Sequence, residues 1–271
     1  DQIGIFGKNI DDVALMLQTI AGADDFDSTV SHLPVPDYTL AMETLGDAPK
    51  RIAYFKEALD HPSLDPAIKE ATEGFIKKLT AQGHIVEPVD FELLEYVVPT
   101  YYVFTTAEAS SNLSRFDGVR FGHRSAQPTN DLTDFYKRSR SEGFGKEVKR
   151  RIMLGTFVLS AGYYDAYFTK AQQVRKKLQL LTDTVFSSYD AIISPTVPAP
   201  AYRIGELQDD QLAMFLGDIY TVFANLVGIP AISIPLFQHP NGMPFGLQIM
   251  TSQSDEVSLL RLSKQFLELS K

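Results

Sequence analysis

The chain has 271 residues, a hydrophobic content of 44%, no cysteine and a formal net charge of −9. This size and composition predict a globular chain with a large core, and the lack of cysteine excludes disulfides, a thiolate nucleophile and a thiolate metal site. The acidic balance argues against a surface that wraps nucleic acid. No apolar run is long enough to span a bilayer and no signal-peptide pattern is present, so we expect a cytoplasmic protein without a membrane partner.

The N-terminal residues predict a helix followed by a long connection. Asn9 is placed to cap the helix, and Val13, Leu17 and Ile20 recur on one face at helical spacing. Residues 24–47 are rich in Asp, Ser and Pro. Because these residues disfavour regular structure, the segment is predicted to be a surface connection.

Residues 51–89 predict a strand, a helix and a second strand. The strands are residues 51–55 and 85–89, and between them Asp65 and Pro66 form a helix start, with Gly83 at its end. Two strands linked by one helix in this length pair in parallel. The chain is therefore predicted to be α/β.

The middle of the chain combines an ambiguous segment with a long helical pattern. Between residues 97 and 140, periodicity does not decide whether residues 101–104 form a strand or a helix. From Phe144 the pattern is helical without interruption to about Phe186. We therefore expect one continuous helix there.

The C-terminal part predicts three strands and a closing helix. Residues 190–194 form an apolar strand that ends at Pro195, because the prolines that follow lack amide donors. Residues 229–235 and 246–250 are joined through an Asn-Gly turn, which predicts an antiparallel pair. With a final helix from Asp255, these elements predict a mixed β-sheet core covered by helices.

Arg151 has an unusual setting for an arginine. At helical spacing its neighbours include Val148, Leu154 and Val158, so its side chain starts from an apolar stripe. One interpretation is that it reaches water or pairs with Glu147 one turn earlier. The other is that it binds a carboxylate or a phosphate. Spacing alone leaves both open.

Asp218 raises a similar question on a helix predicted over residues 209–226. Its neighbours at three and four residues include Met214, Phe215 and Val222, so a carboxylate lies beside an apolar face. Because burial of an unpaired charge is costly, the carboxylate either reaches solvent or meets a cation.

These two charges together suggest an amino-acid site. Arg151 would bind a carboxylate and Asp218 an ammonium group. Four tyrosines are possible walls of that site: Tyr101, Tyr102, Tyr163 and Tyr164. The five histidines are dispersed, which predicts no metal site, and no G-x-S-x-G elbow, phosphate loop or dinucleotide fingerprint is present.

Five strings carry a resemblance to a known family: EASSNLSRFDGVRFGHR (108–124), SEGFGKEVKRRIMLGTFVLSAGYYDAY (141–167), YDAIISPTVPAPAYRIGE (189–206), NLVGIPAISIP (225–235) and PFGLQIM (244–250). They resemble the amidase signature family and, within it, the A subunits of bacterial glutamyl-tRNA(Gln) amidotransferases. The resemblance runs nearly end to end. It implies the amidase-signature fold over residues 1–271, as the C-terminal portion of one such domain.

The resemblance implies a glutaminase inside a larger complex. Such A subunits hydrolyse glutamine, and the ammonia passes to a B subunit that amidates glutamate on tRNA(Gln), with a small C subunit joining the two. Contact with tRNA is then indirect, through the B subunit. No cofactor is expected in this chain, since ATP and Mg are used by the partner subunit.

The family's catalytic residues are not found here. Its Ser-cis-Ser-Lys triad precedes the DQIG motif that opens this chain, so the resemblance implies a fragment that is inactive alone and contributes substrate recognition. Aligned motifs imply that Arg151 binds the glutamine carboxylate and Asp218 its amino group. Tyr101 and Tyr102, in a PTYYV motif, are implied as pocket walls.

Two alternatives stay open. One is a stand-alone amidase-signature hydrolase of small amides, for which an arginine–aspartate pair would have no evident use. The other is a non-catalytic fragment that only binds a partner.

Overall fold

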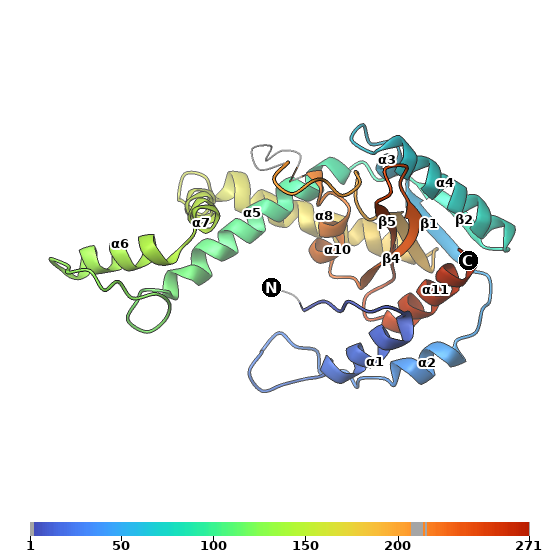
Figure 1. Ribbon diagram of the computed structural model, residues 1–271, viewed down its shortest axis with the longest axis horizontal. Coiled ribbons are helices and arrows are strands. Elements are labelled where there is room, and N and C mark those ends of the chain that lie inside the picture. The colour runs from blue at the N-terminus through green and yellow to red at the C-terminus, as the bar shows by residue number, and fades with distance from the viewer. Residues whose placement is uncertain (1–2, 207–213, 215, 271) are drawn as a thin grey trace. The chain divides into compact units, whose positions relative to one another are not determined.

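The computed structural model describes residues 3–206, 214 and 216–270 (Figure 1). The chain divides into two compact units, one formed by Asp1–Leu94 with Gln179–Lys271 and the other by Glu95–Leu178. The first unit holds a β-sheet with helices, and the second is helical. Among the described helices, none combines the length and apolar character that crossing a membrane requires.

Within its described residues, the first unit contains five strands, which are β1 (Arg51–Phe55), β2 (Ile85–Val89), β3 (Ala191–Pro195), β4 (Ala231–Gln238) and β5 (Pro244–Met250). Its described helices are α1 (Ile10–Ile20), α2 (Tyr38–Thr44), α3 (Lys56–Leu59), α4 (Pro66–Ala81), the last part of α8 (Lys170–Phe186), α10 (Thr221–Val227) and α11 (Glu256–Leu269). The strands form one mixed sheet in the order β2-β1-β3-β5-β4. β1 pairs in parallel with β2 and β3, whereas β5 pairs antiparallel with β3 and β4.

The predicted strand–helix–strand unit is confirmed. Asp65 caps α4 by accepting a hydrogen bond from the Ala67 amide at 2.8 Å, and Pro66 occupies the first turn. Gly83 follows the helix with φ of +93°, a backbone conformation that favours glycine. The turn before β2 therefore depends on that residue.

The main core lies on one face of the sheet. Side chains alternate between faces along each strand, and Ile193, Leu247 and Ile249 belong to the face covered by α4 and α11. There Phe75 of α4 and Phe266 of α11 meet edge to face at 5.6 Å. Burial of these large side chains joins helices that lie far apart in sequence to one sheet.

The opposite face of the sheet carries a smaller aromatic core with a polar group inside it. Phe55, Phe91 and Phe223 pack together, with ring centroids 4.2 to 5.3 Å apart. Ser194 and Gln248, which are register partners on β3 and β5, also point to this side and are buried.

The second unit consists of α5 (Leu94–Asn112), η1 (Leu113–Arg115), α6 (Leu132–Gly143), α7 (Lys146–Val158), the π-helix η2 (Asp165–Thr169) and the first part of α8 (Lys170–Phe186). The segment at residues 101–104, left open by periodicity, is helical within α5.

A close contact holds α5 against α7. A Cβ added at Gly155 would lie 1.9 Å from the Thr106 carbonyl oxygen and 2.6 Å from the Ser110 Cβ, so only glycine fits. One residue further along α7, the Thr156 hydroxyl forms a hydrogen bond with the Ser110 hydroxyl at 3.0 Å. Backbone and side chains of the two helices therefore meet without an intervening layer.

Three sequence expectations are wrong in part. The helix predicted from Phe144 to Phe186 is interrupted at residues 159–163, around Gly162, which weakens a helix. The connection at residues 24–47 contains α2, because Asp37 caps it and Met42 is buried.

The helix predicted over residues 209–226 is also not continuous. Residues 209–213 and 215 lie outside the described residues, but residues 217–220 form a turn, and α10 begins only at Thr221. Gly217 lies at the start of this turn, where its low helix propensity favours a break.

The α5–α7 contact generates a stability prediction. Gly155→Ala should lower the free energy of unfolding by about 1–3 kcal/mol, because the helices must separate to admit the methyl group. Gly162→Ala is the control, since no atom lies within 4 Å of its added Cβ. Thermal unfolding followed by circular dichroism measures both, and equal midpoints for the two variants would contradict the prediction.

A second prediction concerns pH. His84 is 8% exposed, its Nδ1 accepts a hydrogen bond from the Lys50 amide at 3.1 Å, and burial followed by the Lys50 charge lowers its pKa. A depressed histidine pKa favours the neutral form in the folded state, so stability falls as pH drops below about 6.5. In His84→Asn, which keeps an acceptor, the melting temperature should fall less steeply between about pH 7 and pH 5. An unchanged slope would contradict this.

Candidate substrate-binding site

Arg151 lies on α7 with its guanidinium over an aromatic ring of α5. Its carbon centre is 5.9 Å from the Tyr102 ring centroid, and its side chain is 40% exposed. Its Nε donates a hydrogen bond to Glu147 Oε1 at 2.9 Å. The pairing of Arg151 with Glu147, one of the two interpretations from the sequence, is therefore confirmed.

The ion pair occupies only part of the guanidinium. Glu147 is also held by Arg150 at 2.8 Å. Burial tends to raise the Glu147 pKa, but hydrogen bonds from Arg151 and Arg150 outweigh it and leave that pKa below its usual value. In the part of the chain that the structure describes, the terminal nitrogens of Arg151 meet no other carboxylate. A half-exposed fork of donors suits a ligand carboxylate.

Tyr101 and Tyr102 form the aromatic side of this group. Both are partly buried on α5, and their rings meet edge to face at 5.5 Å. Tyr102 lies one turn before Thr106, and Arg151 lies one turn before Gly155. The close contact of Gly155 with Thr106 therefore brings the Arg151 side chain to the Tyr102 ring.

Asp218 lies in the turn at residues 217–220 of the first unit and is partly buried. Its carbonyl accepts hydrogen bonds from the Val222 amide at 3.1 Å and the Thr221 hydroxyl at 3.3 Å, which join the turn to α10. The carboxylate therefore projects from a turn, not from the side of a continuous helix.

Tyr220 anchors the turn that carries Asp218. It is 3% exposed, and its hydroxyl donates to the Ala58 carbonyl at 2.9 Å. The Tyr220 carbonyl accepts a hydrogen bond from Gln248 Nε2 at 3.1 Å. Burial raises the pKa of Tyr220 far above its usual value, so the hydroxyl remains a donor across the physiological range.

The predicted residues fall into two groups. Arg151, Tyr101 and Tyr102 come together in the second unit, whereas Asp218 belongs to the first. Tyr163 packs on Phe157 with ring centroids 4.3 Å apart, in a separate exposed aromatic group.

Sequence reasoning missed Tyr220 and Gln248. A signal for Gln248 was present, because a glutamine inside the apolar strand GLQIM needs buried hydrogen-bond partners. Nothing in the pattern indicated that its partner is the backbone before α10.

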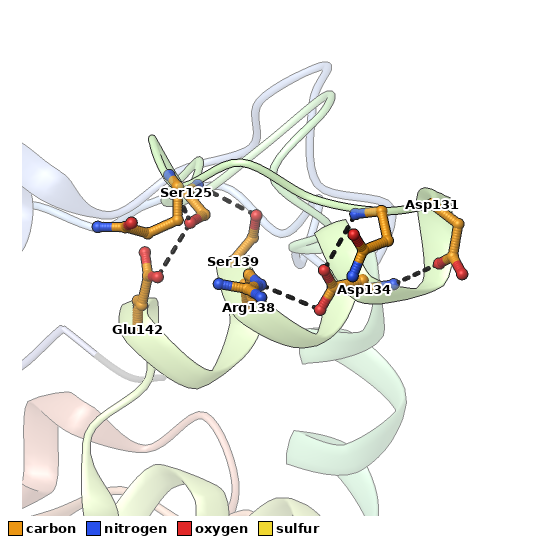
Figure 2. A network of polar contacts seen from close by, with 8 residues as sticks. Ser125, Asp131, Asp134, Arg138, Ser139 and Glu142 are labelled. Carbon is orange, nitrogen blue, oxygen red and sulfur yellow. Dashed lines mark hydrogen bonds and ion pairs between the residues drawn. The ribbon is translucent and has the colours of Figure 1, made fainter.

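A second polar network surrounds α6 (Figure 2). The Ser125 hydroxyl donates to Glu142 Oε1 at 2.9 Å, and the His123 ring contacts Glu142 Oε2 at 2.9 Å. Since the serine meets the carboxylate and not the histidine, this geometry does not activate a nucleophile. With the Ser139 hydroxyl bound to the Ser125 amide at 3.1 Å, it ties the preceding loop to α6.

The described residues offer no candidate metal site. No group of three or more His, Asp or Glu side chains is placed to bind an ion there.

Known proteins resemble the chain over its whole length. The family model described as Amidase matches residues 1–260. The A subunit of glutamyl-tRNA(Gln) amidotransferase from Acidobacterium capsulatum is 48% identical over 275 residues, covering 100% of this chain and 56% of that protein. Its counterpart from Koribacter versatilis is 46% identical over 265 residues, covering 97% and 54%. The chain thus spans about half the length of these curated relatives.

Solved structures with the same fold include relatives of the same kind. The A subunit of glutamyl-tRNA(Gln) amidotransferase from Thermotoga maritima matches with a TM-score of 0.74 and 37% identity, covering 97% of this chain and 51% of that one. A 6-aminohexanoate cyclic dimer hydrolase matches with a TM-score of 0.73 and 20% identity, over 96% of this chain and 53% of its own, which shows a shared fold only. The predicted amidase-signature fold is therefore confirmed, and the chain belongs to the amidase family.

Proposed function

We propose that this chain forms the glutamine-recognition part of an A subunit of a glutamyl-tRNA(Gln) amidotransferase. The observation that carries the proposal is the half-exposed Arg151 guanidinium over Tyr102, whose terminal nitrogens meet no other carboxylate among the described side chains. The chain is also 48% identical to a protein named as the A subunit of glutamyl-tRNA(Gln) amidotransferase, which supports glutamine as the substrate.

Each candidate residue has a distinct role in this proposal. Arg151 binds the α-carboxylate of glutamine through two parallel hydrogen bonds, and Asp218 binds the α-ammonium group. Tyr101 and Tyr102 form a wall along the substrate, and the Tyr102 ring also holds the guanidinium by a cation–π contact. The two charged contacts fix the direction in which the side-chain amide projects.

The chemistry in this proposal belongs to the family's Ser-cis-Ser-Lys triad, which the resemblance places ahead of the DQIG motif. A serine attacks the amide carbon, the C–N bond breaks as ammonia leaves with a proton from the lysine relay, and water then hydrolyses the γ-glutamyl ester. The residues of this chain bind and orient glutamine for that attack. Alone, the chain should release no ammonia.

The proposal includes the setting of the reaction. Ammonia would pass to a B subunit held by a C subunit, with ATP and Mg used there and tRNA contacted through that partner. The protein would work in the cytoplasm. A stand-alone hydrolase of neutral amides fits less well, because such a substrate has no charges for Arg151 and Asp218.

The test uses an exchange protein. In it, residues 1–271 replace the matching segment of the Acidobacterium capsulatum relative, which aligns with all of this chain, and that relative's own partners complete the complex. Glutamine-dependent ammonia release by the exchange protein, with background release by the chain alone, supports the proposal. Release by the chain alone, or none by the folded exchange protein, would contradict it.

Substitutions in the exchange protein test the two charged contacts. Arg151→Lys should raise the KM for glutamine about tenfold or more, since lysine cannot form the bidentate pair. Arg150→Lys is its matched control, because Arg150 also pairs with Glu147 but does not bind the glutamine carboxylate in this assignment. Asp218→Asn should raise KM to a similar extent by removing the charge opposite the ammonium group. Equal KM values for Arg151→Lys and Arg150→Lys would count against the assignment.

A further inference from the structure

We infer that Tyr220 and Gln248 are positioning residues that hold the Asp218 carboxylate where it meets the substrate ammonium group. This inference rests on the proposed function. It adds two residues that do not touch the substrate but act through the turn at residues 217–220.

Gln248 holds this turn from the sheet. It is 4% exposed on β5, and its Nε2 donates to the Tyr220 carbonyl at 3.1 Å and to the Ser194 hydroxyl at 3.2 Å. Because both hydrogen bonds come from one amide group, the turn is fixed relative to β5 and β3 together.

Tyr220 holds the turn from the other side. Its hydroxyl donates to the carbonyl of Ala58 in α3, which follows β1 directly. Phe55, Phe223 and Met250 are among the side chains around a small, apolar cavity that Tyr220 also lines. Apart from Ser194 and Tyr220 themselves, the side chains around that cavity are apolar, so they offer no group to replace either hydrogen bond if it is lost.

Asp218 is only two residues from this double anchor. Its own carbonyl is already committed to the start of α10, through the Val222 amide and the Thr221 hydroxyl. A shift of Tyr220 therefore moves the backbone of Asp218, and a charge–charge contact is sensitive to displacements of this kind.

The experiment measures glutaminase kinetics of the complete exchange protein carrying Tyr220→Phe. This change removes one hydroxyl and leaves the ring. We expect the KM for glutamine to rise about threefold to tenfold with kcat nearly unchanged, the pattern of a weakened binding contact. Tyr189→Phe is the matched control, because its hydroxyl also donates one hydrogen bond, to Glu87 at 3.1 Å, on the sheet edge formed by β2.

A substrate analogue separates positioning from general damage. For 4-carbamoylbutanoate, which is glutamine without its α-amino group, Tyr220→Phe should leave kcat/KM unchanged, because Asp218 then has no ammonium to bind. For the same reason, Tyr220→Phe should have no further effect in an Asp218→Asn background. An equal loss with glutamine and the analogue would overturn the inference.

A second variant covers the case in which Tyr220→Phe does not fold. Gln248→Met keeps the side-chain length, removes both amide donors and should give the same rise in KM for glutamine alone. If Asp218→Asn raises KM but neither anchor variant does, the positioning role is wrong while the proposed function stands. If Asp218→Asn itself leaves KM unchanged, the proposed function is wrong at that residue.

Discussion

The buried amide of Gln248 is the contact on which the arrangement of the first unit around Asp218 depends. A glutamine on an inner strand must satisfy its hydrogen-bonding groups, and here its Nε2 reaches the Tyr220 backbone and the Ser194 hydroxyl. Phe55 and Phe223 line the same small cavity as Ser194 and Tyr220, and all three residues of this polar contact are buried. Water is thereby kept away from hydrogen bonds that fix an otherwise irregular turn.

In the second unit, the candidate charged residue Arg151 is held in place by helix packing. The absence of a side chain at Gly155 lets α7 approach the α5 backbone, and this approach brings the Arg151 guanidinium over the Tyr102 ring. Glu147 then orients the guanidinium from one turn away. Asp218 is thus positioned by buried hydrogen bonds and Arg151 by contact between helices. Both residues remain partly exposed.

Membership of the amidase family gives these two charges a common purpose under the proposed function. A neutral amide needs only the reaction centre, whereas a free amino acid also presents a carboxylate and an ammonium group. Two charged side chains, each held in place by its own surroundings, suit such a ligand. Each contact is strong only when its geometry is fixed in advance.

The sequence by itself determined the elements whose signals are local. Asn9 and Asp65 cap the predicted helices, the parallel and antiparallel strand pairs are where turn and connection lengths put them, and the Arg151–Glu147 pair follows from helical spacing. Only the tertiary structure decided the break before α10, the helical state of residues 101–104 and the anchoring of Tyr220. The anchoring of Tyr220 has a non-local cause, because Ala58 and Gln248 lie 162 and 28 residues away along the chain, and periodicity in a single segment cannot indicate a partner at that distance.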